Sequence, residues 1–467
     1  MGTRRPDRGG GDASLTETPV FGDPARLAAF ETIRAVTGND AYANLALPPL
    51  LRERKISTVD AAFATELTYG TLRNLGTIDR IIELQNERLP DPPVRDALRM
   101  GAYQLLYTRV APHAAVDTTV NLVRSVAHEG SVRFANAIMR RISERSLDEW
   151  LLEIAPDDSV ASLAIRNSHP EWIVRAFVNA LGGDLVETAE LLAADNERPV
   201  VHLSARPGLI EPEELAFQAD GERARWSPYA VIMPSGDPGA LPAIHEGRAH
   251  VQDEGSQLVA AALLAVEVEG HDDRWLDLCA GPGGKAGLMG AIAAQRDARV
   301  LAVEITEHRA DLVAKATRQL PVWVRHADGR SVGEDPELTE GSFDRVLVDA
   351  PCTGLGSLRR RPESRWRRQP SDLPGLTTLQ RELLASALRA VRPGGVVAYV
   401  TCSPHVAETQ MTVKETMRKS NIQLELLDAR QYLPEGMPGL GDGPTVQLWP
   451  HRHGTDAMFL ALLRRTG

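Results

Sequence analysis

The sequence contains little cysteine and no long run of apolar residues, and both absences exclude whole classes of protein. Three cysteines in 467 residues are too few for a disulfide framework. No stretch reaches the roughly 18 consecutive apolar residues of a membrane-spanning helix, and the N-terminal residues MGTRRPDRGGGDAS lack the apolar centre of a signal peptide. We therefore expect a cytoplasmic protein without a membrane segment, in which residues 1–20 form a disordered tail.

The chain also lacks an overall positive charge, which argues against a nucleic-acid partner until the distribution of charge is considered. The net charge is −11, but residues 1–150 contain 19 basic and 19 acidic residues, so the acidic excess lies after residue 150. Within that acidic part, the segment RRRPESRWRR (359–368) carries six arginines and one acidic residue. Salt screens charges beyond about 10 Å, so such a local cluster can still attract a phosphate backbone. A solvated face or a protein-partner site would have the same composition.

A glycine-rich stretch, WLDLCAGPGGK (275–285), predicts a buried strand that runs directly into a turn. Glycine allows positive φ in such a turn and lets a ligand approach main-chain N–H groups. Glu304 ends the next apolar run, 23 positions after Gly281, a spacing that suits a carboxylate that binds a ribose hydroxyl. A tight turn without a ligand would also explain the glycines, but the whole series favours a nucleotide-type cofactor.

The periodicity of apolar residues divides the chain into three parts. Between residues 21 and 150 apolar residues recur at spacings of three and four, as at Val116, Val120 and Val123, which predicts an all-α bundle. On pattern alone this bundle is an interaction or dimerisation module. Residues 151–250 mix helical runs, at 172–180 and 185–194, with the short strands VVHLS and AVIMP, which indicates a small α+β extension.

After residue 270 strands and helices alternate, which predicts an α/β domain with a doubly wound, mostly parallel, Rossmann-like sheet. The final strand, AMFLALLRR, is expected to lie antiparallel to its neighbour. Ligands of such sheets bind at the carboxyl ends of the strands. The other predicted strands are 274–279, 299–304, 321–326, 343–349 and 394–402.

Two of the three cysteines follow the ends of neighbouring predicted strands. FDRVLVDAPC ends its strand at Asp349 and places Cys352 in the following turn, whereas GGVVAYVTCSP places Cys402 directly after the next strand. Both thiols should therefore face the glycine-rich turn at one edge of the sheet, with Asp328 at the end of the third strand. The alternative is that both cysteines are small buried residues.

Methylation of cytosine at C5 is one reaction that needs such a thiol, because C5 is by itself a poor nucleophile. Addition of a thiolate to C6 of cytosine turns the ring into an enamine whose C5 can take a methyl group. Cys402 is well placed for this addition, because Ser403 and Pro404 suit the N-cap and first position of a following helix. The exposed N–H groups of that helix would favour the thiolate.

Six motifs, LDLCAGPGGK, VEIT, HADGR, DAPCTGLG, TCS and HGTDAMFLALLRR, together resemble the RNA cytosine-C5 methyltransferases. DAAFATELTYGTLRN, VRDALRMGAYQLLYTRVAPHAAVDTTV and FANAIMRR resemble the NusB-like RNA-binding domain that opens one family of them, the ribosomal RNA small subunit methyltransferase B family. The resemblance implies S-adenosylmethionine-dependent methylation of cytosine C5 in 16S ribosomal RNA by a seven-stranded methyltransferase sheet, in a monomer without metal. The implied organisation is a tail (1–20), a NusB-like helical domain (21–150), a small α+β extension (151–250) and a methyltransferase domain (251–467).

The resemblance also implies a role for each matching position. Cys402 would be the nucleophile, Cys352 would assist release of the methylated base, and Asp349 would contact both cytosine and cofactor. Two departures from the family pattern, Ala286 and Ala457, remove no reacting group. The implied cofactor-binding residues are Cys279, Ala280, Gly281, Pro282, Gly283, Gly284, Lys285, Glu304, Asp328 and Asp349.

The arginine cluster follows the Pro–Cys dipeptide on the face where the base must enter. Its side chains could hold phosphates and stack on an unpaired base. The target nucleotide would have to be single-stranded or flipped out of a duplex. The predicted RNA-binding residues are Arg359, Arg360, Arg361, Arg365, Trp366, Arg367 and Arg368.

Several alternatives stay open. Cys352 could be the nucleophile, as the cysteine of a Pro–Cys dipeptide is in DNA cytosine methyltransferases. The same reaction could act on transfer RNA or 23S ribosomal RNA, or the chain could be a non-catalytic adapter that binds RNA. A nicotinamide-dependent dehydrogenase is disfavoured because the spaced GxGxxG is absent. His451 and His453 could suggest a metal, but two histidines without further ligands more often cap or pack.

Overall fold

The computed structural model describes residues 22–86 and 90–467. The chain divides into two compact units, residues 1–156 and 157–467. The expected disordered tail (1–20) lies outside the described residues.

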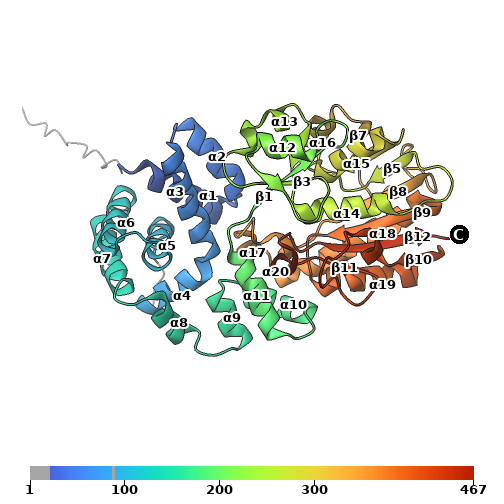
Figure 1. The fold of residues 1–467 in the computed structure, drawn as a ribbon. Coiled ribbons are helices and arrows are strands. Elements are labelled where there is room, and N and C mark those ends of the chain that lie inside the picture. The colour runs from blue at the N-terminus through green and yellow to red at the C-terminus, as the bar shows by residue number, and fades with distance from the viewer. Residues whose placement is uncertain (1–21, 87–89) are drawn as a thin grey trace, which may run out of the picture. The chain divides into compact units, whose positions relative to one another are not determined.

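The described part of the first unit is helical, as the apolar periodicity predicts (Figure 1). Its helices are α1 (Pro24–Asn39), α2 (Ala43–Glu53), α3 (Thr58–Arg73), α4 (Leu75–Gln85), α5 (Pro92–Tyr107), α6 (Pro112–Val126), α7 (Glu129–Ile142) and α8 (Leu147–Ile154). Polar side chains fix several starts: Asp23 caps α1, Ser57 caps α3, and Ser146 forms a capping box with Glu149 at α8. The predicted all-α bundle is confirmed.

The second unit begins with a small α+β part. Its helices are α9 (Val160–Arg166), α10 (Glu171–Ala180), α11 (Leu185–Asn196), α12 (Pro212–Gln218) and α13 (Pro242–His245), and its strands are β1 (Val201–Ala205), β2 (Glu222–Arg223), β3 (Ala230–Met233) and β4 (Ala249–Val251). The strands form an antiparallel sheet in the order β2-β3-β1-β4, with Leu203 opposite both Val231 and Val251. The predicted mixture of helices and short strands is confirmed.

A large sheet follows, with the strand order β10-β12-β9-β8-β5-β6-β7 and a short β11 paired to β12. Its strands are β5 (Arg274–Asp277), β6 (Arg299–Glu304), β7 (Val322–His326), β8 (Phe343–Asp349), β9 (Val391–Thr401), β10 (Leu424–Leu427), β11 (Val446–Gln447) and β12 (Phe459–Arg465). Strands β5 to β9 pair in parallel, whereas β12 is antiparallel to β9 and β10. The predicted doubly wound sheet with an antiparallel last strand is confirmed, and β10 and β11 were not predicted.

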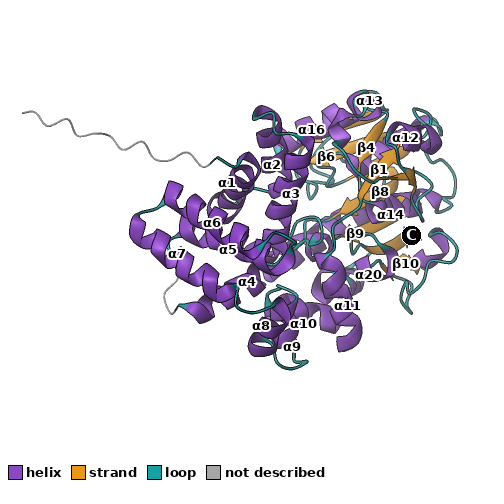
Figure 2. Ribbon diagram, turned by 60° about the vertical axis from the view of Figure 1, so that its left-hand side comes forward, coloured by secondary structure: helices purple, strands orange, loops and turns teal. Residues whose placement is uncertain are grey.

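Helices cover both faces of the large sheet (Figure 2). They are α14 (Glu254–Ala265), α15 (Gly284–Ala294), α16 (Glu307–Thr317), α18 (Leu373–Ala390) and α19 (Gln410–Lys419). Two short helices, α17 (Ser364–Arg367) and α20 (Pro450–His453), lie in the connections between the strands. On one face α14 and α15 pack with Val396, Ala398 and Val400 of β9, and on the other α18 and α19 pack with Val397 and Tyr399. Alternate side chains of one strand therefore serve two cores, as in other sheets covered on both faces. Within the described residues, no helix is both long and apolar enough to cross a membrane.

Candidate active site

The glycine-rich turn joins β5 to α15 at the carboxyl edge of the parallel strands. Gly283 has φ of 108°, in the region that side chains other than hydrogen rarely adopt. The amide of Gly281 donates to Glu304 Oε2 over 3.1 Å, and the amide of Thr306 donates to Glu304 Oε1 over 2.9 Å. The turn and the acidic end of β6 are therefore joined directly, and the contact of Glu304 with a ribose hydroxyl stays a prediction. Four more predicted cofactor residues, Cys279, Ala280, Pro282 and Gly284, lie in or beside the same turn.

Asp277, the last residue of β5, is a buried carboxylate that the sequence analysis did not single out. It is 1% exposed, and its Oδ1 accepts from the Cys279 amide over 3.3 Å, whereas its Oδ2 has no hydrogen-bond partner among the described residues. Burial, followed by the charge of Asp349, raises the pKa of Asp277 to about 7. An unused carboxylate oxygen beside the turn suits a cationic ligand. Its signal in the sequence was the single acid within the apolar segment WLDL.

Lys285 and Asp349 form an ion pair, with Lys285 Nζ 2.7 Å from Asp349 Oδ2. Lys285 lies in the first turn of α15 and Asp349 ends β8. Burial lowers the pKa of Lys285, but the charge and hydrogen bond of Asp349 outweigh it, so the pKa ends above its ordinary value. The side chain of Asp349 is 27% exposed, so the pair can offer both a donor and an acceptor to a bound group.

Cys352 and Cys402 are free thiols whose Sγ atoms lie 3.4 Å apart. A hydrogen bond from Cys352, helped by the charge of Lys285, lowers the pKa of Cys402 despite its burial. The same contact, then burial and the charge of Glu408, raises the pKa of Cys352. Of the two thiols, Cys402 is therefore the one that ionises more easily.

The two cysteine-bearing loops touch through their backbones at Gly356. Its amide donates to the carbonyl oxygen of Cys402 over 2.9 Å, and its carbonyl oxygen accepts from the Ala457 amide over 2.8 Å. A Cβ at position 356 would lie 2.1 Å from the Ala457 oxygen. Only glycine allows this approach, which places the Pro–Cys loop against the loop after β9.

The helix after Cys402 begins later than predicted, so one argument for the reactivity of this thiol is wrong. Helix α19 starts at Gln410 and is preceded by a 3-10 turn, Val406–Glu408. Ser403 does not cap a helix, because its hydroxyl donates to Glu408 Oε2 over 2.6 Å. The lowered pKa of the thiol comes from neighbouring side chains, not from a helix terminus.

Asp328 lies two residues beyond β7, and its carboxylate is engaged by Arg330. The guanidinium of Arg330 donates to both carboxylate oxygens, with a closest distance of 2.6 Å. The adjacent Gly329 packs against the carbonyl oxygen of Leu278, so this loop borders the end of β5. The side chain of Asp328 is 34% exposed.

Arg365 is fully buried, which corrects the prediction that it binds RNA phosphates. Its guanidinium donates to the carbonyl oxygens of Ser168 (3.2 Å) and Asp195 (2.9 Å) and to Asn196 Oδ1 (2.8 Å). These partners belong to the α+β part, so this arginine attaches the short α17 to that part. The pattern of the sequence could not separate it from its neighbours, because a run of arginines does not reveal which one faces inward.

Arg359 and Arg360 also serve the fold. Arg359 is 4% exposed and donates to the Gly454 carbonyl oxygen over 2.6 Å, and Arg360 pairs with the buried Asp456, its Nε 2.9 Å from Oδ1. The prediction of RNA contact is therefore corrected for Arg359 and weakened for Arg360. The members that lie nearer the surface are the exposed Arg361 and the half-buried Trp366, Arg367 and Arg368.

Three of the four ring nitrogens of His451 and His453 have partners within the protein. His453 Nδ1 accepts from the Trp449 amide over 2.8 Å, and its Nε2 lies 2.7 Å from the Pro438 carbonyl oxygen. His451 Nε2 lies 2.9 Å from Glu187 Oε1. These three contacts are those of residues that pack within the protein.

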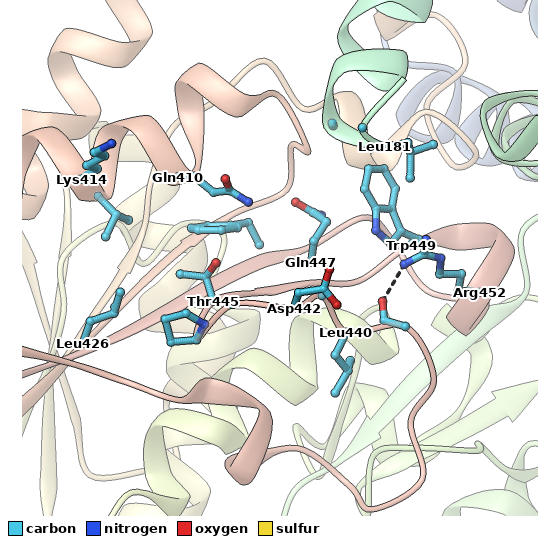
Figure 3. Close-up of a pocket in the computed structure, with 18 of the residues that line it drawn as sticks. Leu181, Gln410, Lys414, Leu426, Leu440, Asp442, Thr445, Gln447, Trp449 and Arg452 are labelled. Atoms are coloured by element: carbon cyan, nitrogen blue, oxygen red, sulfur yellow. Dashed lines mark hydrogen bonds between the residues drawn. The ribbon is translucent and has the colours of Figure 1, made fainter. Parts of the chain in front are cut away.

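A separate cavity of about 1020 Å³ lies between α19, β12 and the loop that contains Leu440 (Figure 3). Gln410, Lys414 and Gln447 line it, and Trp449 forms part of its wall. None of the predicted site residues lines it. The predicted catalytic and cofactor-binding residues lie instead at the glycine-rich turn, at the two cysteines and at the ends of the neighbouring strands.

Comparison with known proteins gives a consistent result. Residues 263–464 match the family model of the 16S rRNA methyltransferases RsmB/F, and residues 23–144 match that of the NusB family. The chain is 54% identical to a Mycobacterium tuberculosis protein named as a methyltransferase, over 95% of this chain and 97% of that protein. It is 30% identical to ribosomal RNA small subunit methyltransferase B of Escherichia coli, over 90% and 96% of the two chains. The crystal structure of PH0851 has the same fold, with a TM-score of 0.78, 24% identity, and coverage of 96% and 100%.

Proposed function

We infer the reaction of this chain from one premise: it belongs to the 16S rRNA methyltransferase RsmB/F family and is an S-adenosylmethionine-dependent RNA methyltransferase. We propose that it methylates C5 of a cytosine in 16S ribosomal RNA, as a monomer, and that Cys402 bonds transiently to C6 of the base. The observation that carries this proposal is the contact between Cys402 and Cys352, 3.4 Å apart, beside the ion pair of Lys285 and Asp349.

The residues around the glycine-rich turn fit the proposed cofactor. S-adenosylmethionine, when bound, supplies an electrophilic methyl group next to a positive sulfur, and it also carries an ammonium group. Asp277 Oδ2, which is buried and has no hydrogen-bond partner among the described residues, would compensate such a positive charge. The residues proposed to hold the cofactor are Cys279, Ala280, Gly281, Pro282, Gly283, Gly284, Lys285, Glu304, Asp328 and Asp349.

The side chains of the cleft divide the work of the reaction. Cys402, as the thiolate, adds to C6 of cytosine, and the ammonium of Lys285 offsets negative charge near the sulfur and Asp349. Asp349 can accept a hydrogen bond from the exocyclic amine of the base. Cys352 keeps its proton and donates a hydrogen bond to the departing sulfur when the C6–S bond breaks, which favours release of the methylated base.

RNA binding is proposed for two regions. The NusB-like helices are one, by analogy with the RNA-binding domain that they resemble. The other is the outer part of the arginine cluster, Arg361, Trp366, Arg367 and Arg368, next to the Pro–Cys loop. A base that enters this cleft must be unpaired, and planar guanidinium and indole groups stack well on unpaired bases.

Trapping the covalent intermediate tests the proposal. The purified protein and its Cys352→Ala and Cys402→Ala variants are incubated with labelled S-adenosylmethionine and 16S, 23S or transfer RNA, and the products are separated under denaturing conditions. We expect Cys352→Ala to accumulate a protein–RNA adduct and Cys402→Ala to form none. The reverse pattern would make Cys352 the nucleophile. Full methylation by Cys402→Ser would refute the covalent mechanism. Methylation of only 23S or transfer RNA would refute the assignment of 16S RNA as the substrate.

A further inference from the structure

Glu408 is a fully buried carboxylate that has four hydrogen-bond donors. Its Oε1 accepts from the amide of Thr353 over 2.8 Å and from Gln380 Nε2 over 3.0 Å. Its Oε2 accepts from the hydroxyl of Ser403 over 2.6 Å and from the hydroxyl of Thr353. Among the described residues, no Lys, Arg or His lies within ion-pair distance of it. Four hydrogen bonds therefore compensate for the burial of this carboxylate.

The donors come from the two loops that carry the cleft cysteines. Thr353 directly follows Cys352, and Ser403 directly follows Cys402. The hydroxyl oxygens of Thr353 and Ser403 also lie 3.1 Å from each other. One carboxylate thus binds the neighbour of each thiol, and it does so on the side of the loops away from the solvent.

The carboxylate is itself held in place by its surroundings. The hydroxyl of Tyr399, in the middle of the sheet core, donates to the main-chain oxygen of Glu408 over 2.8 Å. The amide of Gln380 on α18 bridges the carboxylate and the carbonyl oxygen of Pro351, which it reaches over 2.9 Å. The support of the two loops therefore extends from β9, a strand of the large sheet, and from α18, a helix that packs on it.

We propose that Glu408 is a positioning residue that fastens the Pro–Cys loop to the loop after β9, and so keeps the sulfur atoms of Cys352 and Cys402 in contact. Its consequence for catalysis rests on the proposed function, whereas its effect on the distance between the thiols does not. An apolar side chain would fill the same space without the cost of a buried charge. A carboxylate, unlike an apolar side chain, can accept four hydrogen bonds here, and these bonds hold both loops at once.

The release step is the one that depends most on this arrangement. In that step solvent water takes the C5 proton, the electron pair of the C5–H bond restores the C5=C6 double bond, and the C6–S bond breaks. The electron pair of that bond goes to the sulfur of Cys402, and the S–H group of Cys352 donates a hydrogen bond to the thiolate. Loosening the loops removes this donor from its place, so release slows more than addition.

The test compares Glu408→Ala with Glu408→Gln in the full-length protein with 16S RNA. The control is Glu415→Gln, which changes a half-buried carboxylate of α19 that pairs with Arg381. The readouts are the protein–RNA adduct, methyl transfer, and S-adenosylmethionine affinity by calorimetry. We expect Glu408→Ala to accumulate adduct and to lose about tenfold or more in turnover, with cofactor affinity unchanged. Glu408→Gln should recover part of the turnover, because the hydroxyls of Thr353 and Ser403 can rotate to accept from its amide. Ser403→Ala, which removes one of the four bonds, serves if Glu408→Ala does not fold.

Two results would overturn the proposal. The first is that Glu408→Ala and Ser403→Ala show the same turnover and the same amount of protein–RNA adduct as the Glu415→Gln control. The other is a parallel loss of cofactor affinity, thermal stability and adduct formation in all variants at this site, which would mark a general structural role.

A reaction-independent measurement separates this proposal from the proposed function. Diamide takes two protons and two electrons from a pair of adjacent thiols and leaves a disulfide. We expect the Cys352–Cys402 link, mapped by mass spectrometry, to form about tenfold more slowly in Glu408→Ala than in the parent protein. Equal rates would refute the fastening of the loops even if the covalent mechanism holds. If Cys402→Ser still methylates RNA, the proposed function fails while this rate difference remains.

Discussion

Replacing Arg365 by serine should destabilise the second unit and leave RNA binding by the folded protein unchanged. The side chain is fully buried and donates three hydrogen bonds, at 2.8, 2.9 and 3.2 Å. The substitution removes a charged donor from two main-chain carbonyl oxygens and one amide oxygen, and each buried acceptor left without a partner costs about 1–3 kcal/mol. The expected loss in the free energy of unfolding is therefore about 3–5 kcal/mol, the range seen when one member of a buried charged network is removed.

The measurement is urea unfolding followed by circular dichroism, together with RNA binding at several salt concentrations. For a unit of this size the loss corresponds to a decrease in melting temperature of about 10 °C. The matched control is Arg361→Ser, in the same cluster but exposed, which should change stability by less than about 0.5 kcal/mol. If Arg361 contacts a phosphate, that control should reduce the slope of log affinity against log salt by about 0.7–0.9. An Arg365→Ser protein as stable as the parent, with a flattened salt slope, would refute the buried position.

Three further predictions concern the cleft. Gly356→Ala should abolish methyl transfer and lower the free energy of unfolding by about 2 kcal/mol or more, because the added Cβ would lie 2.1 Å from the Ala457 oxygen. The control Gly375→Ala should be tolerated, because a Cβ there would have no atom within 4 Å. Equal activity of the two variants would contradict this packing. Burial raises the pKa of Asp277 to about 7, and a cationic cofactor favours the charged form of this carboxylate. Binding of S-adenosylmethionine should therefore release a proton near neutral pH, and the affinity should increase as the pH rises through 7. Calorimetry in buffers of different ionisation enthalpy measures the proton release, which Asp277→Asn should lose. Lys285→Met should move alkylation of Cys402 by iodoacetamide to higher pH, because a cation that lowers the pKa of this thiol has been removed. Peptide mapping measures the extent of alkylation at each pH. An unchanged pH profile of alkylation would exclude that electrostatic role.

The regular parts of the fold could be predicted because their patterns are long and repetitive. The alternation of strands and helices after residue 270 specified the parallel sheet, and the carboxyl ends of its strands identified the edge at which the cysteines meet. Strand β10 (LELL) was not predicted because it has four residues, of which only Leu427 is buried. Strand β11 was not predicted because it has two residues.

The errors arose where one tertiary contact overrides a local preference. Ser403 and Pro404 form a good helix start by composition, but the buried Glu408 takes the serine hydroxyl, and the helix begins at Gln410. Arg365 belongs to a charged run, yet its side chain is buried because it donates hydrogen bonds to main-chain oxygens of the α+β part. Such partners lie far away in the sequence, so no local pattern contains them.

The position of β12 has a consequence for biosynthesis. It lies between β9 and β10 in space but is the last of the three to leave the ribosome, 58 residues after the end of β9 (401 to 459). At about 5–20 residues per second, translation needs about 3–12 s to cover that interval. During this time one edge of β9, with the apolar segment VVAYV, has no strand to pair with, and such edges recruit other nascent chains. The yield of this protein in a host cell should therefore depend on chaperones that shield emerging polypeptides, more than on the final stability of the folded sheet.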